Sequence, residues 1–324
     1  MTLLRGATAM KSLVFCFTLL STIAICVFAS LPAQAQRARV FVSVTGNDAN
    51  PCTAGSPCKT FQATHDAVLA GGEISVLDTG GYGTLIINKS VSIVAVGVQA
   101  SIATASGQDA ITVNAGSTDK ISLRGLTLDG GGVGQNGIFF KTGGSLTVED
   151  CVLRNLNGDG IGFFPPTTAT LVVSNSYFND GNAAGIDIDS VGSGRFTVSI
   201  DRSTFSGNNY GVYVQGLSGT LPVDVAVTDS VASNHLATGF FAQSGTNHSV
   251  INLSLTRVLA EGNDVGFQAN GTNAILWLTQ STLTGSKFHG FEIDTGGVIK
   301  TYGDNSLAAN NAASVGSLTS VAKQ

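Results

Sequence analysis

The sequence predicts an all-β fold, a right-handed parallel β-helix of three sheets and about ten coils, with a short capping helix at its N-terminal end. Two observations carry this prediction. A glycine followed by alternating apolar residues recurs at near-constant intervals, and two further short strands follow most of its occurrences without a helical pattern between them. Because a stack of such coils buries apolar faces that one coil leaves exposed, the repeat indicates a solenoid.

Residues 1–35 have the three parts of a secretory signal peptide. Arg5 and Lys11 supply the positive start, residues 12–28 form the apolar run, and Ala33-Gln34-Ala35 is a small-x-small cleavage site. A membrane anchor is the alternative, but the run is short for a span of about 20 residues and a cleavage site follows it. We therefore expect secretion, to the periplasm or beyond the cell, after cleavage near Ala35, and no membrane span afterwards.

The charge balance argues against nucleic-acid binding. The chain has 21 acidic against 16 basic residues, and only 11% of its residues are charged. Proteins that bind nucleic-acid phosphates concentrate lysine and arginine on one face, and no such basic stripe occurs in this sequence. The four histidines are scattered and form no metal-binding spacing, so we expect no resident metal or cofactor.

Residues 36–72 precede the repeat and contain a tight loop with Cys52 and Cys58. In an exported protein, such a pair is expected to form a disulfide. A metal site is the alternative, but two thiols without a nearby histidine do not complete one.

Residues 60–69 have the pattern of a short amphipathic helix that would cover the open end of the first coil. Thr60 is a suitable N-cap, and the glycine pair at 71–72 provides a stop. The helix face predicted to pack consists of Phe61, Thr64 and Val68.

The repeat itself occupies residues 73–313, and a polar tail follows at 314–324. Its glycines are separated by 23, 25, 26, 28, 27 and 24 residues, at positions 137, 160, 185, 211, 239, 266 and 290. Since a strand points every second side chain inward, Ile138 and Phe140 are predicted to stack on Ile161 and Phe163. The third strand of each coil supplies a second inner ladder of Leu153, Phe178, Phe205, Ala232, Ala260 and Leu283.

Two further assignments complete the solenoid. The first coil is predicted to contain residues 74–77, Leu85–Ile87 and Val91–Val94. Cys151 aligns with Ser176, Ser203, Ser230 and Ser281 in the repeat, which favours a buried free thiol over a nucleophile.

The sequence resembles the pectin-lyase-like superfamily, and in particular the bacterial right-handed parallel β-helix repeat proteins. The resemblance rests on residues 42–53 (VSVTGNDANPCT) and 57–62 (PCKTFQ), with Gly81-Tyr-Gly83 and Ile87-Asn-Lys-Ser90 further along. It implies the fold. It leaves the function open, because the superfamily includes lyases, hydrolases, esterases, epimerases, adhesins and binding proteins.

The motifs of the catalytic relatives are incomplete in this chain. The resemblance to polygalacturonases implies acids in two successive turns, and residues 157–161 (NGDGI) match the first turn with one mismatch, whereas the next turn reads Asn182-Ala-Ala184. Pectin methylesterases would need an arginine beside a tryptophan, and Trp277 lies in the sequence Ile-Leu-Trp-Leu. Pectate lyases would need Ca²⁺-binding acids and an arginine base. None of these sets is complete.

One outward face nevertheless gathers groups suited to sugars. In residues 185–189 (GIDID), alternation directs both isoleucines inward and Asp187 and Asp189 outward. These aspartates are the candidates for proton transfer, or for Ca²⁺ binding if the chain is a lyase. The outward neighbours predicted to contact substrate are Phe164, Tyr213, Gln215, Phe241 and Gln243, with Lys141, Arg195 and Arg202 as candidate nearby cations.

The sequence therefore favours an exported β-helix protein that binds polysaccharide or serves a surface role without catalysis. A polysaccharide lyase or glycoside hydrolase acting on acidic glycans through an exterior groove is the first alternative. An adhesin-like surface protein is the second. A lysine or arginine beside the carboxylates would favour the enzyme, and a strip of aromatic and amide side chains would favour binding.

Overall fold

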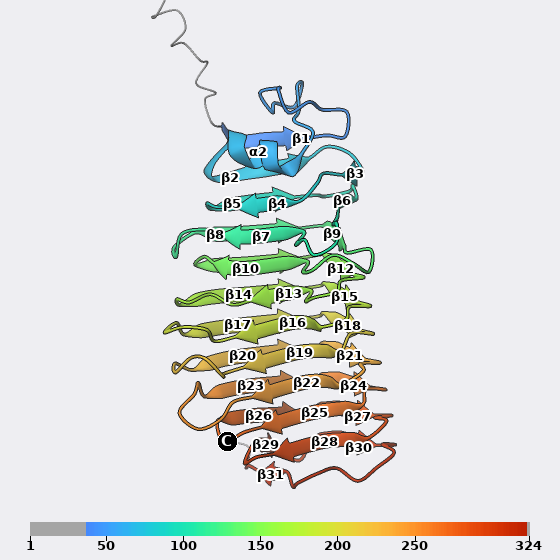
Figure 1. Cartoon of the computed structure of the whole chain (residues 1–324). Helices are drawn as coiled ribbons and strands as arrows, with labels where there is room; N and C mark the ends of the chain where they lie inside the picture. The colour runs from blue at the N-terminus through green and yellow to red at the C-terminus, as the bar shows by residue number, and fades with distance from the viewer. Residues whose placement is uncertain (1–36, 323–324) are drawn as a thin grey trace, which may run out of the picture. The chain divides into compact units, whose positions relative to one another are not determined.

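The computed structural model describes residues 37–322, which form one unit of about nine turns in which three parallel sheets wind around a common core (Figure 1). The predicted all-β parallel solenoid is confirmed. The predicted signal peptide, residues 1–35, lies outside the described residues. Within residues 37–322, no helix is long and apolar enough to cross a membrane.

Each full turn contributes one strand to each sheet, so that strands adjacent in a sheet come from successive turns. The twelve-stranded sheet contains β1 (Arg37–Val42), β2 (Val68–Val76), β5 (Val91–Val94), β8 (Lys120–Arg124), β11 (Ser145–Glu149), β14 (Ala169–Ser174), β17 (Phe196–Asp201), β20 (Val223–Thr228), β23 (Ile251–Thr256), β26 (Ala274–Thr279), β29 (Val298–Thr301) and β31 (Thr319–Ser320). The ten-stranded sheet contains β3 (Gly80–Gly81), β6 (Ala100–Ala103), β9 (Leu126–Asp129), β12 (Val152–Arg154), β15 (Tyr177–Asn179), β18 (Thr204–Ser206), β21 (Val231–Ser233), β24 (Leu259–Glu261), β27 (Thr282–Thr284) and β30 (Ser306–Ala308). The nine-stranded sheet contains β4 (Leu85–Ile87), β7 (Ile111–Asn114), β10 (Ile138–Thr142), β13 (Ile161–Phe163), β16 (Ala184–Asp189), β19 (Tyr210–Gln215), β22 (Thr238–Gln243), β25 (Val265–Asn270) and β28 (His289–Asp294).

A short helix, α2 (Phe61–Ala67), lies at the N-terminal end of the stack (Figure 1). The Thr60 hydroxyl accepts a hydrogen bond from the amide of Ala63, as predicted for an N-cap. Phe61 is fully buried, and its ring centroid lies 5.1 Å from that of Tyr82. The helix therefore seals one end of the apolar core. Beside it, Cys52 and Cys58 form the predicted disulfide.

The predicted end of this helix is wrong. The helix ends at Ala67, and the glycine pair at 71–72 lies within β2 rather than acting as a stop. Gly72 pairs with Val91, and a Cβ on it would lie 2.7 Å from the carbonyl oxygen of Ala38 on the neighbouring strand. Glycine is required there by the close approach of two strands.

The composition of the first coil also differs from the prediction. Ile74 pairs with Ile93, so residues 74–77 and Val91–Val94 belong to successive turns. The strand that completes the first turn, β3, consists of two glycines and has no apolar alternation for a sequence pattern to detect. At the other end, Thr319 and Ser320 in the C-terminal tail pair with β29.

The inner ladders follow the predicted alignment. Ile138 pairs with Ile161, and Phe140 pairs with Phe163, with ring centroids 4.8 Å apart. In the ten-stranded sheet, Phe178 pairs with Phe205, and their rings stack at 4.9 Å. All these side chains are at most 1% exposed, so the core is a continuous column of aliphatic and aromatic residues.

The repeated glycines of the nine-stranded sheet are explained by contacts between turns. A Cβ on Gly160 would lie 2.4 Å from the carbonyl oxygen of Gly185, and one on Gly211 would lie 2.4 Å from that of Gly239. Neither Gly160 nor Gly211 has a positive φ. The repeat therefore keeps glycine because each turn approaches the next too closely for a side chain.

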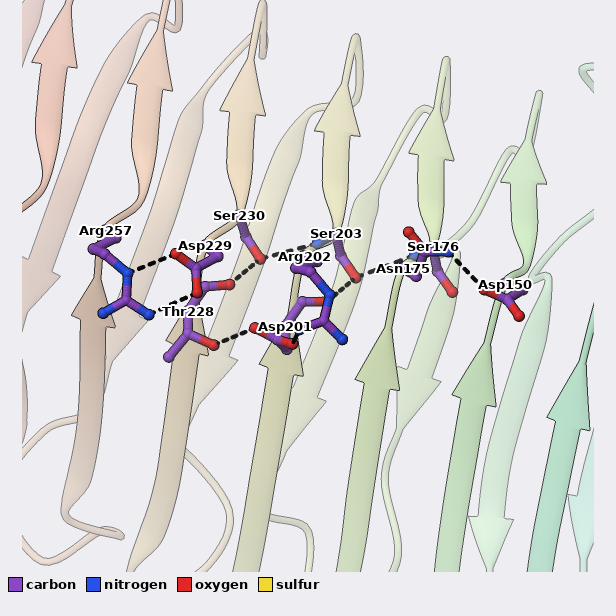
Figure 2. Close-up of polar contacts among 10 residues, drawn as sticks. All are labelled: Asp150, Asn175, Ser176, Asp201, Arg202, Ser203, Thr228, Asp229, Ser230 and Arg257. Carbon is purple, nitrogen blue, oxygen red and sulfur yellow. Dashed lines mark hydrogen bonds and ion pairs between the residues drawn. The ribbon is translucent and has the colours of Figure 1, made fainter.

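The corner between the twelve- and ten-stranded sheets carries a serine ladder (Figure 2). The amide of Ser176 donates to the Ser203 hydroxyl over 3.3 Å, and the amide of Ser203 donates to the Ser230 hydroxyl over 3.1 Å. These bonds satisfy buried amides at a corner where the strand ladder is interrupted. From β11 to β27 this corner is always two residues long. The connections from the nine- to the twelve-stranded sheet vary in length, and residues 143–144 are a short example and residues 216–222 a long one.

The residue before each ladder position adopts a left-handed backbone conformation. Asp150 has a φ of 55° and Asn175 a φ of 49°, and both residue types tolerate this region. Asp229 also lies in this column and pairs with Arg257 of the next turn (Figure 2). The corner thus joins successive turns through buried serines and exposed polar side chains.

Cys151 occupies the first position of this ladder, and its amide donates to the Ser176 hydroxyl over 3.2 Å. The thiol is 1% exposed, and burial raises its pKa to about 12. After removal of residues 1–35, the native protein should show no thiol that reacts with Ellman's reagent, and one after unfolding in denaturant without reductant. Rapid labelling of the folded protein would contradict the buried placement. A structural thiol is thereby distinguished from a nucleophile.

Candidate functional site

The candidate site is the outer face of the nine-stranded sheet, where β16, β19 and β22 lie side by side. Their register forms two columns of outward side chains that run along the stack. The first column contains Asp187, Tyr213 and Phe241, and the second contains Asp189, Gln215 and Gln243. The structure thus brings these predicted residues onto one surface.

Asp187 is the most enclosed carboxyl group on this face, with 9% of its surface exposed. The amide nitrogen Nε2 of Gln215 donates to both of its carboxylate oxygens, over 3.0 and 2.9 Å. On the other side, its register partner is Gly162, which has no side chain to carry a counter-charge. Burial, followed by repulsion from Asp159, raises the pKa of Asp187 to about 8. At neutral pH this carboxyl is therefore mainly protonated.

Asp159 is a member of the cluster that sequence alignment did not assign to this face. It lies just before β13, and its Oδ1 accepts a hydrogen bond of 3.0 Å from the amide of Ala184. Burial raises its pKa to about 6, and burial also raises the pKa of Asp189. Asp109, Asn136 and Asp159 each lie two residues before a strand of the nine-stranded sheet, and hydrogen bonds link them from turn to turn. This recurring polar position is the signal in the sequence.

The aromatic residues present their edges rather than their faces to solvent. The rings of Tyr213 and Phe241 stack with centroids 4.8 Å apart at an angle of 3°, and Tyr210 stacks on Tyr213 at 4.9 Å. Phe241 is only 6% exposed, and the Tyr213 hydroxyl donates to the Oε1 of Gln243. Because the rings cover one another, this column offers a ligand polar groups such as the Tyr213 hydroxyl rather than open ring faces.

Phe164 belongs to a separate aromatic contact further toward the N-terminal end. Its ring packs edge-on against Phe139 with centroids 5.7 Å apart. Both rings flank Gly162, where a Cβ would lie 3.3 Å from Phe164 and 3.4 Å from Phe139. The pair therefore borders the surface beside Asp187 and restricts the access of water to that carboxyl.

The three cations suggested by the sequence lie elsewhere or have other contacts. Arg195 pairs with Asp224 and Arg202 pairs with Asp201, both on the twelve-stranded sheet or its corner. Lys141 does lie on the nine-stranded sheet, but its ammonium is 4.7 Å from the ring centroid of Phe139. Within residues 37–322, no group of three His, Cys, Asp or Glu residues is arranged to hold a metal ion.

Residues 71–225 match the family model described as right-handed beta helix region. Among solved structures, the crystal structure of pectate lyase Pel9A has a TM-score of 0.58 at 16% identity, covering 89% of this chain and 79% of that one. A rhamnogalacturonan lyase gives 0.55 at 15% identity, with 86% of each chain covered. The alginate lyase from Paenibacillus sp. str. FPU-7 gives 0.53 at 13% identity, with 87% and 99% covered.

No curated protein sequence matches the chain. At these identities the structural likeness establishes the architecture and leaves the chemistry open. The chain is thus a right-handed β-helix protein, structurally similar to pectate, alginate and rhamnogalacturonan lyases.

Proposed function

We propose that this protein binds a polysaccharide strand along the outer face of the nine-stranded sheet, without catalysis of its own. The observation that carries the proposal is a row of half-exposed polar side chains on consecutive strands, about 4.8 Å apart. The row consists of Asp189, Gln215, Gln243, Asn270 and Asp294. Regularly spaced amides and carboxylates suit the hydroxyl groups of an extended sugar polymer.

Two further points support binding. The structurally similar proteins include lyases named for pectate, rhamnogalacturonan and alginate, so this architecture accommodates polysaccharides. Export, as residues 1–35 predict, would place the row among extracellular or periplasmic glycans. An adhesin-like role would use the same row on a surface glycan.

Glycan cleavage is a second candidate, and one specific observation favours it. Asp187 has a pKa of about 8 and Asp159 a pKa of about 6, so neutral pH leaves the first mainly protonated and the second mainly ionised. Such a divided pair is the usual basis for acid and base roles. Against this, Asp187 is enclosed and held by Gln215, and the three suggested cations do not reach it. Binding is therefore the better supported function.

Calorimetric titration with a panel of acidic and neutral polysaccharides tests the binding proposal. The Gln215→Ala/Gln243→Ala variant is expected to bind its best ligand about 30-fold more weakly, since each of the two substitutions removes hydrogen bonds worth about 1 kcal/mol. Thr170→Ala/Thr197→Ala, on the exposed face of the twelve-stranded sheet, is the matched control. Unchanged affinity in the glutamine variant, or no ligand in the panel, would count against this face.

The same preparations should be assayed for new reducing ends and unsaturated products, with and without Ca²⁺. Product formation that disappears in Asp187→Asn would establish the cleavage candidate and assign the proton donor. Binding without product formation would establish the non-catalytic function.

A further inference from the structure

The twelve-stranded sheet carries an aromatic site that the proposed function does not use. Trp277, the only tryptophan of the chain, lies on β26, where alternation buries Ala274, Leu276 and Leu278 and turns Trp277 outward. The indole is half-buried on a sheet face whose other outward residues are mostly small or polar. A ligand that covered the remaining exposed part of the indole would remove apolar ring surface from water, which favours binding.

A lysine accompanies the tryptophan. Lys300 follows it in the outward column of the next strand, and its ammonium lies 4.1 Å from the ring centroid of Trp277. Tyr302 supports the arrangement, with its ring 6.4 Å from the indole at an angle of 30°. The lysine is thus fixed at a defined place on the sheet rather than extended freely into water.

Lys300 also differs from most cations of this chain. Arg39, Arg124, Arg154, Arg195, Arg202, Arg257 and Lys287 all form ion pairs with carboxylates. Among residues 37–322, Lys300 has a ring contact but no acidic partner, although the chain has 21 acids against 16 bases. Its charge is therefore available to an external anion.

The neighbour on the other side of the indole leaves room for a ligand. Trp277 pairs with Ser254 on β23, and Ser254 pairs with Ala226 on β20. Both side chains are too short to cover an indole. The Ser254 hydroxyl makes no side-chain hydrogen bond within the described part of the chain, so it can donate to or accept from a sugar hydroxyl.

We propose that Trp277, Lys300 and Ser254 form a binding site for a sugar ring that carries an anionic group. The face of the indole toward Ser254 contacts the C–H face of the sugar, and the serine bonds a hydroxyl. The Lys300 ammonium, on the opposite face, pairs with a carboxylate or sulfate that extends past the edge of the ring. The site lies on a different sheet from Asp187 and Gln215, so it stands whether or not the nine-stranded sheet binds a glycan.

Because Trp277 is the sole tryptophan, its fluorescence reports this site directly. Trigalacturonate and a sulfated galactose trisaccharide are the two anionic probes, and maltotriose is the neutral one. We expect a saturable change in emission with at least one anionic probe and none with maltotriose; the probe that responds identifies the anion. Lys300→Gln should weaken binding about tenfold, and Lys300→Arg should restore most of the affinity.

Three control variants show whether the signal arises at this site. Lys120→Gln removes an exposed lysine from β8 of the same sheet and should leave the affinity unchanged. Trp277→Phe, followed by calorimetry, should retain part of the affinity because a smaller ring still packs on the sugar. The Gln215→Ala/Gln243→Ala variant should give the same fluorescence titration as the unchanged protein.

Three results with the unchanged protein or the Lys300→Gln variant would each overturn the proposal. These are no saturable change up to the solubility limit of both anionic probes, an equal response to maltotriose, or unchanged affinity in Lys300→Gln. Loss of the tryptophan response in the glutamine variant would equally overturn it, by assigning the signal to the nine-stranded sheet.

Discussion

Asp187→Asn is expected to stabilise the protein by on the order of 5 kcal/mol above pH 8 and to have little effect below pH 4. The folded state raises the pKa of this carboxyl from 3.8 to about 8, so the native protein binds a proton that the unfolded chain has already released. Stability is therefore lost as the pH rises from about 4 to about 8. Asparagine has a similar shape and no charge to bury, and it retains an oxygen that accepts from Gln215.

The measurement is urea unfolding, followed by circular dichroism, at several pH values between 4 and 9. The difference between the two proteins should grow across this interval and level off above pH 8. His235, whose pKa burial lowers to about 4, destabilises both proteins equally as the pH falls below 6.5. Its contribution cancels in the difference.

Asp180→Asn is the matched control. Asp180 is exposed and has a φ of 56°, a conformation that asparagine also tolerates. We expect this substitution to change stability by less than about 0.5 kcal/mol at any pH in the series. A pH-independent effect of Asp187→Asn would mean that the carboxyl is not held in its neutral form, and the assignment of Asp187 as a proton donor would lose its basis.

Gly160→Ala should destabilise the fold by about 3 kcal/mol, since an added methyl group in a closely packed interior displaces backbone rather than a flexible side chain. The new Cβ would lie 2.4 Å from the carbonyl oxygen of Gly185 and 2.7 Å from the ring of Phe178. Relief of these contacts requires two turns to separate, which weakens the strand pairing between β13 and β16.

Gly245→Ala is the control for that substitution, because a Cβ there meets only His248, at 3.9 Å, and its φ is not positive. It should change the denaturation midpoint little. Comparable losses in the two variants would show that contact between turns does not account for the repeated glycine.

Much of the architecture could be predicted because each turn of the solenoid corresponds to one repeat of the sequence. Strand alternation assigns an inward or outward direction to each residue, and the spacing of the glycines aligns Leu153 with Phe178 and Phe205. The strand β3 could not be predicted, because Gly80 and Gly81 carry no alternation. The end of α2 was misplaced, because backbone pairing of Gly72 determined the boundary.

The sequence predicts which residues lie on the candidate face, but it does not predict how buried they are or which of them contact one another. The outward direction of Asp187 and Asp189 follows from the strand period, whereas the burial of Asp187 depends on Gly162 of the preceding turn and on rings beside it. Likewise, alternation indicates that Tyr213 and Phe241 share a face but does not reveal that their rings cover each other. Such properties arise from contacts between turns and require the three-dimensional structure.

Two kinds of corner differ in how constant they are. The corner between the twelve- and ten-stranded sheets has a constant length, whereas the connections from the nine- to the twelve-stranded sheet vary in length and form a rim along that sheet. The serine ladder keeps the corner between the twelve- and ten-stranded sheets at constant length. Successive turns therefore keep their register there even when other connections differ in length. Differences in turn length occur in the connections that leave the nine-stranded sheet, beside the ends of the strands that carry Asp189, Gln215 and Gln243. Insertions at that rim could therefore reshape ligand selectivity without disturbing the core, which makes residues 216–222 and 244–250 natural positions for grafting new recognition loops.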